Sequence, residues 1–567
     1  MTLAQFCLAA LVLLPLLTSA TTILLRHQHR RILGAGAAVA VSLLTVPVVL
    51  AVAGGTPAEL ALGGYEAPLG IHLRADGLSA LFLMMSTVVG AVTTFHAAAL
   101  PHSTGQQVVT AGPPTGPVPR LNPEGVGSDG HHHVTGHTQD PAKDPSAPSI
   151  WRRAHPGFWP LWLGCWSGLN AVFLSGDLFN TYVGLELVGI TAVGLVALGG
   201  RSAWSAALRY LFVAVLGSLL FLIGVGLIAS VTGTLDMLQA AEALEDQESA
   251  RPAAVFALCL MSVGLAMKLA LVPMHRWLVP AHSGAPGAVS PLLSALVIKA
   301  ALFVLLRCWL WVIAPSLAGD PGSGAALSVL AWAFGGLSAA AILVGSVMAL
   351  RQDRLKPLVA YSTVAQAGYW LLFLPILFGT GAEGLPGAAE HEAGSEPSTV
   401  AAAGAVSGAV ALALGHGLAK AALFLAAGFL KDLYGTDEIS ALRGSGRHNP
   451  LLIMAIGLSA VGLIGLPISL GFTGKWQLAT AAVAAGQWWI VVVVALGTLL
   501  TAAYLLRAVA PLLVESDGGG AVETPEWKFR HVPLLPQLAA FTLGTLTVLT
   551  GMLGVQISTL LEVGAPW

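Results

Sequence analysis

Uninterrupted apolar runs, each long enough to cross a lipid bilayer, recur along almost the whole chain. A membrane-spanning helix needs about 20 predominantly apolar residues, because the hydrocarbon core of a bilayer is about 30 Å thick. Of the 567 residues, 56% are hydrophobic and only 10% are charged, whereas soluble domains carry about 25% charged residues. Lipid must therefore solvate most of the exterior, and the net charge of −2 gives no support to a nucleic-acid partner.

These runs predict an all-α polytopic protein of the cell membrane, with about fourteen transmembrane helices. An even number of spans would place both termini on the same side of the membrane. Arg26 and Arg30 follow the first run and no basic segment precedes it, so we expect that run to be a retained helix rather than a signal peptide. The expected spans are residues 3–25, 33–53, 77–99, 157–175, 177–199, 205–231, 253–274, 286–312, 325–349, 357–379, 402–430, 451–482, 487–510 and 537–560.

The loops between these spans alternate in charge. One set carries most of the basic residues, whereas the other carries only Arg74 and Arg251 and is rich in acids. The basic set includes Arg26, Arg30, Arg31, Arg120, Lys143, Arg152, Arg153, Arg201, Arg209, Arg276, Arg351, Arg354, Lys356, Lys431, Arg443, Arg447, Arg507, Lys528 and Arg530. Because cytoplasmic loops carry an excess of Lys and Arg, the basic set is expected in the cytoplasm and both termini outside.

One basic-side loop, residues 101–156, is much longer than the others. It is rich in Gly, Pro, Ser and His, and it includes the consecutive residues His131, His132 and His133. No carboxylate or cysteine spacing accompanies these histidines, so the composition favours a disordered cytoplasmic insertion over a metal site.

Several charged residues fall inside the expected spans. They are Glu186, Lys268, Lys299, Arg307, Lys420 and Lys475. A charge at the centre of a bilayer costs about 2.5–3.5 kcal/mol on insertion scales, so such residues face the protein interior or water and mark ion pathways. For Lys268, Lys299 and Lys420 we favour a functional role over static ion pairs. Arg307, and to a lesser degree Lys475, can instead be interpreted as side chains that extend toward the membrane surface.

The spacing of these groups suits proton transfer. His416 and Lys420 lie four residues apart and so share one helix face. Burial weakens the hold of a lysine on its proton and a nearby carboxylate strengthens it, so a carboxylate that approaches or withdraws can move a proton along a series of lysines. Histidine is a suitable intermediate, because its ordinary pKa is about 6.5.

Two prolines accompany these charges. Pro273 follows Lys268, and Pro467 precedes Lys475. Proline frees a backbone carbonyl and breaks a helix, and broken helices in the two halves of a transporter indicate ion paths near the midplane. Each proline alone is also consistent with an ordinary kink, but the pairing with a lysine favours helix breaks.

The residues predict no cofactor, no metal centre and no catalytic centre within the chain itself. The four cysteines lie far apart in apolar runs, without the CxxC or Cys/His spacing of a zinc or iron–sulfur site. Glycine-rich phosphate loops and Ser-His-Asp arrangements are likewise not found in the sequence.

Five ordered motifs indicate a family. They are LSGDLFNTYVGLEL, MKLALVPMHRWLVPAHSGAPGAVSPLLSALVIKAALFVLLR, DRLKPLVAYSTVAQAGYW, HGLAKAALF and GLIGLPISLGFTGKW. Over residues 60–510 the chain resembles the antiporter-like subunits shared by Mrp-type cation/proton antiporters, respiratory complex I and group 4 membrane-bound hydrogenases.

The resemblance implies both an architecture and a set of site residues. It implies fourteen helices with two inverted five-helix repeats, a Glu–Lys pair at Glu186 and Lys268, and a central lysine at Lys299. It also implies an exit path through His416, Lys420 and Lys475. The expected organisation is residues 1–100 as the first three helices, 101–156 as the insertion, 157–312 and 325–510 as the repeats, and 511–567 as the last loop and helix.

The motifs divide between branches of this superfamily. GDLFN resembles the D-type subunit of Mrp antiporters, whereas PMHRWLVPAH resembles complex I and hydrogenase subunits, with Val279 at a usual proline. The leading hypothesis is a D-type, proton- and cation-translocating subunit of a multi-subunit antiporter, with other membrane subunits as partners and Na+ as a candidate cation. The alternatives are a proton-pumping subunit of a complex I-like or hydrogenase complex, and an energy-coupling subunit of an inorganic carbon uptake complex.

The loop charges generate a test of topology. A cysteine in place of Ser128, within the 101–156 insertion, should resist an impermeant thiol reagent applied to intact cells, because this loop is expected in the cytoplasm. The same reagent should label it after the cells are permeabilised. Labelling from outside in intact cells would invert the proposed orientation.

Overall fold

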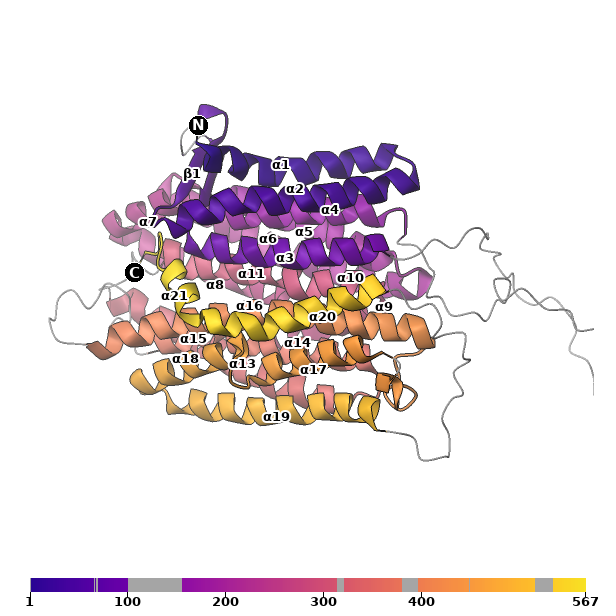
Figure 1. The fold of residues 1–567 in the computed structure, drawn as a ribbon. Coiled ribbons are helices and arrows are strands. Elements are labelled where there is room, and N and C mark those ends of the chain that lie inside the picture. Colours follow the sequence, from indigo (N-terminus) through magenta and orange to yellow (C-terminus); the bar gives the residue numbers. More distant parts are fainter. Residues whose placement is uncertain are drawn as a thin grey trace, which may run out of the picture.

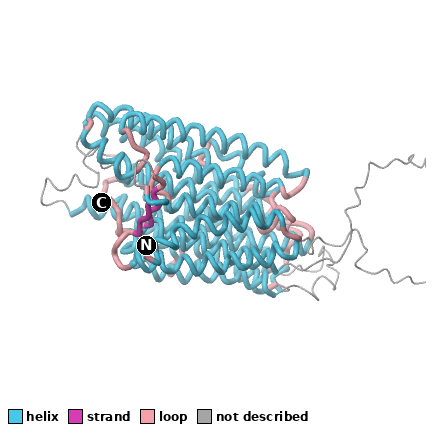
Figure 2. The backbone as a smooth tube through the Cα atoms, turned by 90° about the horizontal axis from the view of Figure 1, so that it is seen from above, coloured by secondary structure: helices cyan, strands magenta, loops and turns pink. Residues whose placement is uncertain are grey.

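The computed structural model describes residues 2–65, 67, 70–99, 155–313, 321–379, 396–447, 449–514 and 534–566, so most of the 101–156 insertion lies outside the described residues. The described parts form a bundle of long helices that run side by side, with one short β-hairpin at one end (Figures 1 and 2). Helix α1 lies at one edge of the bundle and α19 at the other.

The first part of the bundle contains α1 (Leu3–Leu24), α2 (His27–Ala53), β1 (Ala58–Ala61), β2 (His72–Ala75), α3 (Gly77–Ala99), α4 (Phe158–Leu174), α5 (Leu178–Ala197), α6 (Arg201–Thr232), α7 (Met237–Asp246), α8 (Arg251–Lys268), α9 (Leu278–Gly284), α10 (Val289–Leu292) and α11 (Ile298–Arg307). The second part contains α13 (Pro321–Leu350), α14 (Leu355–Leu371), α15 (Phe373–Phe378), α16 (Glu396–Tyr434), α17 (Pro450–Ile464), α18 (Leu470–Ala484), α19 (Trp488–Leu513), α20 (Leu534–Leu549) and α21 (Gly554–Leu561).

The predicted all-helical polytopic architecture is confirmed. Within the described residues, 12 helices are long and apolar enough to cross a membrane, and α17 is a shorter apolar helix. Each of the expected spans falls on one or more of the helices. The count of fourteen crossings and the internal symmetry of the two five-helix sets remain predictions.

Two expected spans are not continuous helices. Span 253–274 is helical only as far as Lys268, where α8 ends, and span 451–482 divides into α17 and α18. At the second break Gly465 adopts a left-handed conformation, φ 81°, and ends α17. Ser469 then accepts a hydrogen bond from the Phe472 amide and begins α18.

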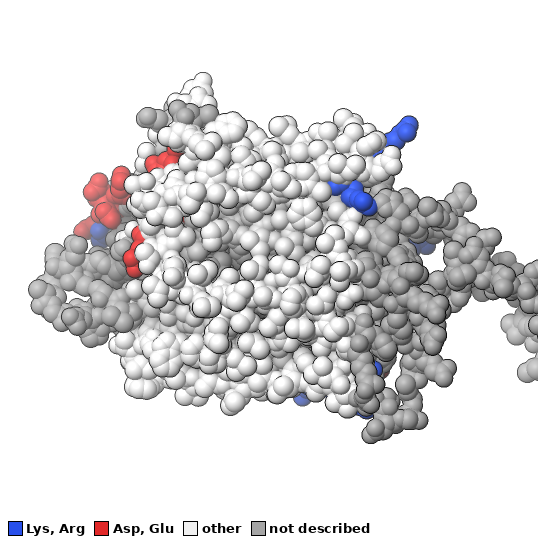
Figure 3. All heavy atoms as spheres, in the orientation of Figure 1, with Lys and Arg blue, Asp and Glu red and all other residues white. Residues whose placement is uncertain are grey.

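The two termini lie at the same end of the bundle (Figure 1). There the Gly77 amide donates a hydrogen bond to the Val563 carbonyl at 2.8 Å, which joins the last turns of the chain to the start of α3. On the face seen in Figure 3, acidic side chains gather at this end and most of the basic ones lie at the opposite end. This segregation agrees with the alternating loop charges, and the side that faces the cytoplasm remains a prediction.

The centre of the bundle is formed by helices without contact with the exterior. Every residue of Val289–Ile313 is buried, and this stretch contains two π-helical segments, Leu293–Val297 and Cys308–Ile313, on either side of α11. Helix α16 packs against α14 and α18 beside it. Lysines on these helices are shielded from lipid by the other helices, which satisfies the demand that intramembrane charges face inward.

Arg307 forms a buried ion pair within the protein. Its side chain is only 3% exposed, and its guanidinium donates to both carboxylate oxygens of Asp76 at 2.5 and 2.7 Å, and to the Ser79 hydroxyl at 2.9 Å. A two-pronged pair of this kind is among the strongest polar contacts. It joins the end of α11 to the loop before α3, and a neighbouring carboxylate was the partner that sequence reasoning missed.

The Arg307–Asp76 pair should be essential to stability. Replacing Asp76 by Asn leaves a buried guanidinium without its countercharge and should cost about 3–5 kcal/mol. Asp353→Asn, which breaks an exposed pair with Arg507, should cost less than about 1 kcal/mol. The measurement is the thermal unfolding midpoint of the purified protein in detergent. The double variant Asp76→Asn/Arg307→Met should recover part of the loss, and equal midpoints for Asp76→Asn and Asp353→Asn would contradict this role.

Candidate functional site

The first part of the site is an ion pair between α5 and α8. The Lys268 ammonium lies 3.7 Å from a Glu186 carboxylate oxygen, and the Ser218 hydroxyl on α6 donates a hydrogen bond to the same carboxylate. Lys268 is the last residue of α8, immediately before the break, so its side chain reaches α5 across a close approach of glycines on α6 and α8. Gly217 and Gly264 touch each other's backbone there, and a Cβ on either would clash with the other's carbonyl.

Glu186 occupies an unusual position for a carboxylate. Its side chain is 38% exposed on the surface of this chain, whereas the Lys268 side chain is only 9% exposed. Phe179, Val183 and Ile190 lie on the same stripe of α5 and are also exposed, as on a surface that meets lipid or another apolar helix. A carboxylate in such a stripe is costly in lipid, so this face is suited to contact with another membrane subunit.

The central part of the site joins α11 to α16. Lys299 is fully buried, and its amine donates to the Ser294 carbonyl at 2.8 Å and contacts Nδ1 of His416. The amine also lies 4.4 Å from the centre of the Trp370 ring, which His416 meets edge-on. The π-helical turn Leu293–Val297 precedes Lys299 and directs the Ser294 carbonyl toward the amine.

Lys420 lies one turn beyond His416 on α16 and is also fully buried. Its amine donates to the Val359 carbonyl at 2.7 Å and to the Ser362 hydroxyl, both on α14. These partners are neutral oxygen acceptors. The described residues place no carboxylate in an ion pair with Lys299 or Lys420.

Lys475 uses the break between α17 and α18. Its amine donates to the Ile464 carbonyl at 2.8 Å and to the Leu463 carbonyl at 3.3 Å, which are the last carbonyls of α17. The amine also lies 5.0 Å from the centre of the Tyr369 ring. Pro467 lies within this break, and Ile468 next to it has a positive φ of 77°. The interrupted helix thus supplies the acceptors that hold a lysine within the membrane.

The break after Lys268 is constructed in a similar way. Ala270 has a positive φ of 56°, and the peptide bond before Pro273 is cis. The Met267 carbonyl, at the end of α8, accepts hydrogen bonds from the Trp277 indole at 3.0 Å and from the Ala270 amide at 3.2 Å. Both prolines singled out in the sequence therefore lie at interruptions that follow or precede a relay lysine.

Two buried residues near this site were not singled out in the sequence. His282 on α9 is 1% exposed, and its ring stacks on Phe424, which lies one turn beyond Lys420 on α16. Lys356, assigned above to a cytoplasmic loop, is instead 2% exposed on α14 and donates to the Ala285 carbonyl at 2.9 Å. The histidine in WLVPAH could have been found as a polar residue in an apolar motif.

The structure brings some of the expected partners together and leaves others apart. It joins Glu186 to Lys268 and Lys299 to His416, and it places Lys420 one helical turn from His416. The described side chains form no direct hydrogen bond between Lys268 and Lys299, or between Lys420 and Lys475. Lys268 and Lys299, and likewise Lys420 and Lys475, are therefore not joined directly by their side chains.

The described residues contain no group of three or more His, Cys, Asp or Glu side chains that could hold a metal ion. The histidines at 131–133 lie outside those residues. The four cysteines are free thiols, and three of them are buried. The amines, imidazoles and carboxylate described above are groups that can take up and release protons.

A family profile described as the transmembrane part of NADH:quinone oxidoreductase and Mrp antiporter proteins matches residues 175–389 and 398–501. The chain belongs to this family. Its match covers the Glu186–Lys268 pair, the central lysine and the path to Lys475.

Individual relatives come from both branches of the family. The chain is 33% identical over 423 residues to the N subunit of the NADH-quinone oxidoreductase of Desulforudis audaxviator, covering 73% of this chain and 78% of that protein. It is 26% identical over 474 residues to the D subunit of the Na(+)/H(+) antiporter of Alkalihalophilus pseudofirmus, covering 83% and 79%. Its fold is similar to that of a chain in the Mrp complex from Dietzia sp., with a TM-score of 0.74, 23% identity and coverage of 99% and 96%.

The hydroxyl of Ser218 generates a prediction for the family's ion transport. Ser218→Ala removes one donor to Glu186 and should lower the rate of transport by about one to two orders of magnitude, because a hydrogen bond to a charged group contributes about 1.5–3 kcal/mol. Ser230→Ala is the matched control on α6, since Ser230 bonds only the Leu227 carbonyl of its own helix. Dissipation of a pH gradient in everted vesicles that carry the whole complex measures both. Equal loss in the two variants would show that Ser218 does not support Glu186.

Proposed function

We propose that this chain is a proton- and cation-translocating membrane subunit of a multi-subunit Mrp-type antiporter, similar to the D-type subunits. The proposal rests on a difference in the partners of the buried basic residues. Lys268 has a carboxylate partner, Glu186, whereas Lys299, His416 and Lys420 are buried against neutral groups and one another. The named Na(+)/H(+) antiporter relatives and the fold of the Mrp chain support this function.

The mechanism follows from this contrast. Glu186 holds a proton on Lys268 when the two side chains are close, and withdrawal of the carboxylate releases it toward the bundle centre. Lys299 receives it and passes it through His416 to Lys420, and the path ends at Lys475 beside the broken helix. Because the groups interact closely, their protons are taken up and released as a coupled set rather than singly.

The exposed position of Glu186 supports assembly with another membrane subunit. A partner that covers the stripe Phe179, Val183, Glu186 and Ile190 would remove the carboxylate from lipid and could move it relative to Lys268. Through such a partner, a conformational change elsewhere in the complex would alter the Glu186–Lys268 pair.

A second candidate is a proton-pumping subunit of a complex I-like enzyme. The observation in its favour is the 33% identity to the N subunit of an NADH-quinone oxidoreductase, which exceeds the 26% identity to the D subunit of the antiporter. The two functions use the same relay and differ in the energy source. Transport driven by an imposed Na+ gradient without NADH or quinone supports the antiporter, and a requirement for electron transfer supports the pump.

Substitutions at the Glu–Lys pair test the relay. Glu186→Gln and Lys268→Ala should each abolish transport, because the proton can no longer be held and released. Glu186→Asp keeps the charge with a shorter reach and should retain part of the activity, and Arg201→Gln, at an exposed position, should retain all of it. The measurement is pH-gradient dissipation in everted vesicles with the whole complex, with protein abundance determined by blot. Full transport by Lys268→Ala at normal abundance would leave these residues as structural ion pairs.

A further inference from the structure

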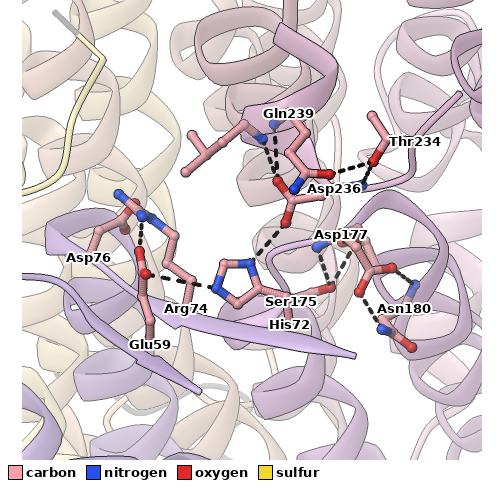
Figure 4. A network of polar contacts seen from close by, with 12 residues as sticks. Glu59, His72, Arg74, Asp76, Ser175, Asp177, Asn180, Thr234, Asp236 and Gln239 are labelled. Carbon is pink, nitrogen blue, oxygen red and sulfur yellow. Dashed lines mark hydrogen bonds and ion pairs between the residues drawn. The ribbon is translucent and has the colours of Figure 1, made fainter. Parts of the chain in front are cut away.

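A β-hairpin at the acid-rich end of the bundle is joined to the starts of two helices. The Gly176 amide donates to the His72 carbonyl at 2.8 Å, the Leu178 amide to the Leu235 carbonyl at 2.9 Å, and the Met237 amide to the Gly176 carbonyl at 3.0 Å. These backbone bonds connect β2, the first turn of α5 and the first turn of α7. We refer to this junction, residues 72–76, 175–178 and 234–237, as the clasp (Figure 4).

His72 is the one side chain of the clasp with both ring nitrogens directed at carboxylates. Its Nδ1 lies 2.8 Å from Oδ2 of Asp236, and its Nε2 lies 3.9 Å from Oε2 of Glu59. A neutral imidazole carries a proton on only one nitrogen, whereas an imidazolium presents a donor to each carboxylate. The side chain is 18% exposed, so protons from the surrounding solution can reach it.

The other charges around His72 divide into those that favour its protonation and one that opposes it. Asp236 is held in place by hydrogen bonds from the amides of Leu238 and Gln239, at 3.0 and 3.1 Å, and Asp177 lies across a β-bridge from it. Arg74 opposes the positive charge on His72, but it is itself paired with Glu59 and lies 3.9 Å from Asp76. Two carboxylates thus face the His72 ring, whereas the one guanidinium beside it is paired with Glu59.

The direction of the pKa shifts agrees with this geometry. The hydrogen bond to Asp236 raises the pKa of His72 above its ordinary value. Burial alone would raise the pKa of Asp236, but the bonds from His72 and from the Gln239 and Leu238 amides lower it. The stabilising contribution of the His72 charge is therefore complete below about pH 6.5 and is lost as the pH rises through the raised pKa, while Asp236 stays ionised unless the pH falls below about 4.

We propose that His72 makes the clasp a proton-operated latch. The charged imidazole holds the hairpin to the start of α7 and, through the backbone bonds, to the start of α5; the neutral imidazole holds it less tightly. Helix α5 carries Glu186 two turns further along, so the latch governs how firmly the outer end of that helix is anchored. The loop-charge rule places this end outside the cell. The latch therefore makes the junction respond to external pH, a property beyond the proposed transport function.

Hydrogen–deuterium exchange of the purified complex tests the latch without any transport measurement. Peptides that contain the amides of Gly176, Leu178 and Met237 would be followed in the wild type and in His72→Gln at the same pH values between 6 and 9. Glutamine keeps one N–H donor but cannot become charged. The exchange ratio of variant to wild type should be about fivefold at pH 6, since a charge-assisted hydrogen bond exceeds a neutral one by about 1 kcal/mol, and should approach one at pH 9.

Two further variants keep the result decisive. His29→Gln, at an exposed position on α2 at the other end of the bundle, should give a ratio near one at every pH. Asp236→Asn retains the ability to begin α7 but removes the charge, so it should reproduce the pH-dependent ratio of His72→Gln even if that variant fails to assemble. A ratio that does not change between pH 6 and 9 in both His72→Gln and Asp236→Asn would overturn the latch, whatever the outcome of the relay experiments.

Discussion

The cost of a charge in lipid determines how this chain is arranged. Each intramembrane lysine must find either a carboxylate or a set of oxygen acceptors away from the hydrocarbon. Lys268 meets the first condition through Glu186, and Lys299 and Lys420 meet the second on helices that other helices surround. The outer helix α1, by contrast, has exposed apolar side chains and contains no charged residue.

The helix interruptions follow from the same constraint. A continuous helix uses all its carbonyls internally, so it offers few acceptors to an amine within the membrane. The break after Ile464 frees two carbonyls for Lys475, and the π-helical turn before Lys299 directs another to its amine. These irregularities cost the helix some of its backbone hydrogen bonds. They occur where a basic side chain or an indole donates a hydrogen bond to the carbonyls concerned. Helix interruptions are therefore expected beside lysines that lie within the membrane.

Sequence reasoning could locate the helices and the relay residues, because both depend on local patterns. Apolar length marks a span, and a lysine within a span stands out at once, as at Lys299 and Lys420. Contacts between distant segments have no such signal. The carboxylate partner of Arg307 was not predicted because Asp76 lies 231 positions away in sequence, and Lys356 was assigned to a loop because it falls just before the expected span 357–379. His72 and Asp236 lie in separate loops, and only the folded hairpin brings them together.

The proposed relay also offers a reason why the chain resembles both antiporter and respiratory subunits. Lys299, His416 and Lys420 are buried inside this chain, against groups on α11, α14 and α16, so we expect that central part to be the same whatever the source of energy. The exposed carboxylate of Glu186 is different, because it lies at the surface where a neighbouring subunit can reach it. A partner subunit driven by a cation gradient or by electron transfer could move Glu186 relative to Lys268. In both cases the same proton would be released from Lys268. Under the proposed function, specificity for one energy source lies in a subunit that covers α5, and the buried path is common to both kinds of complex.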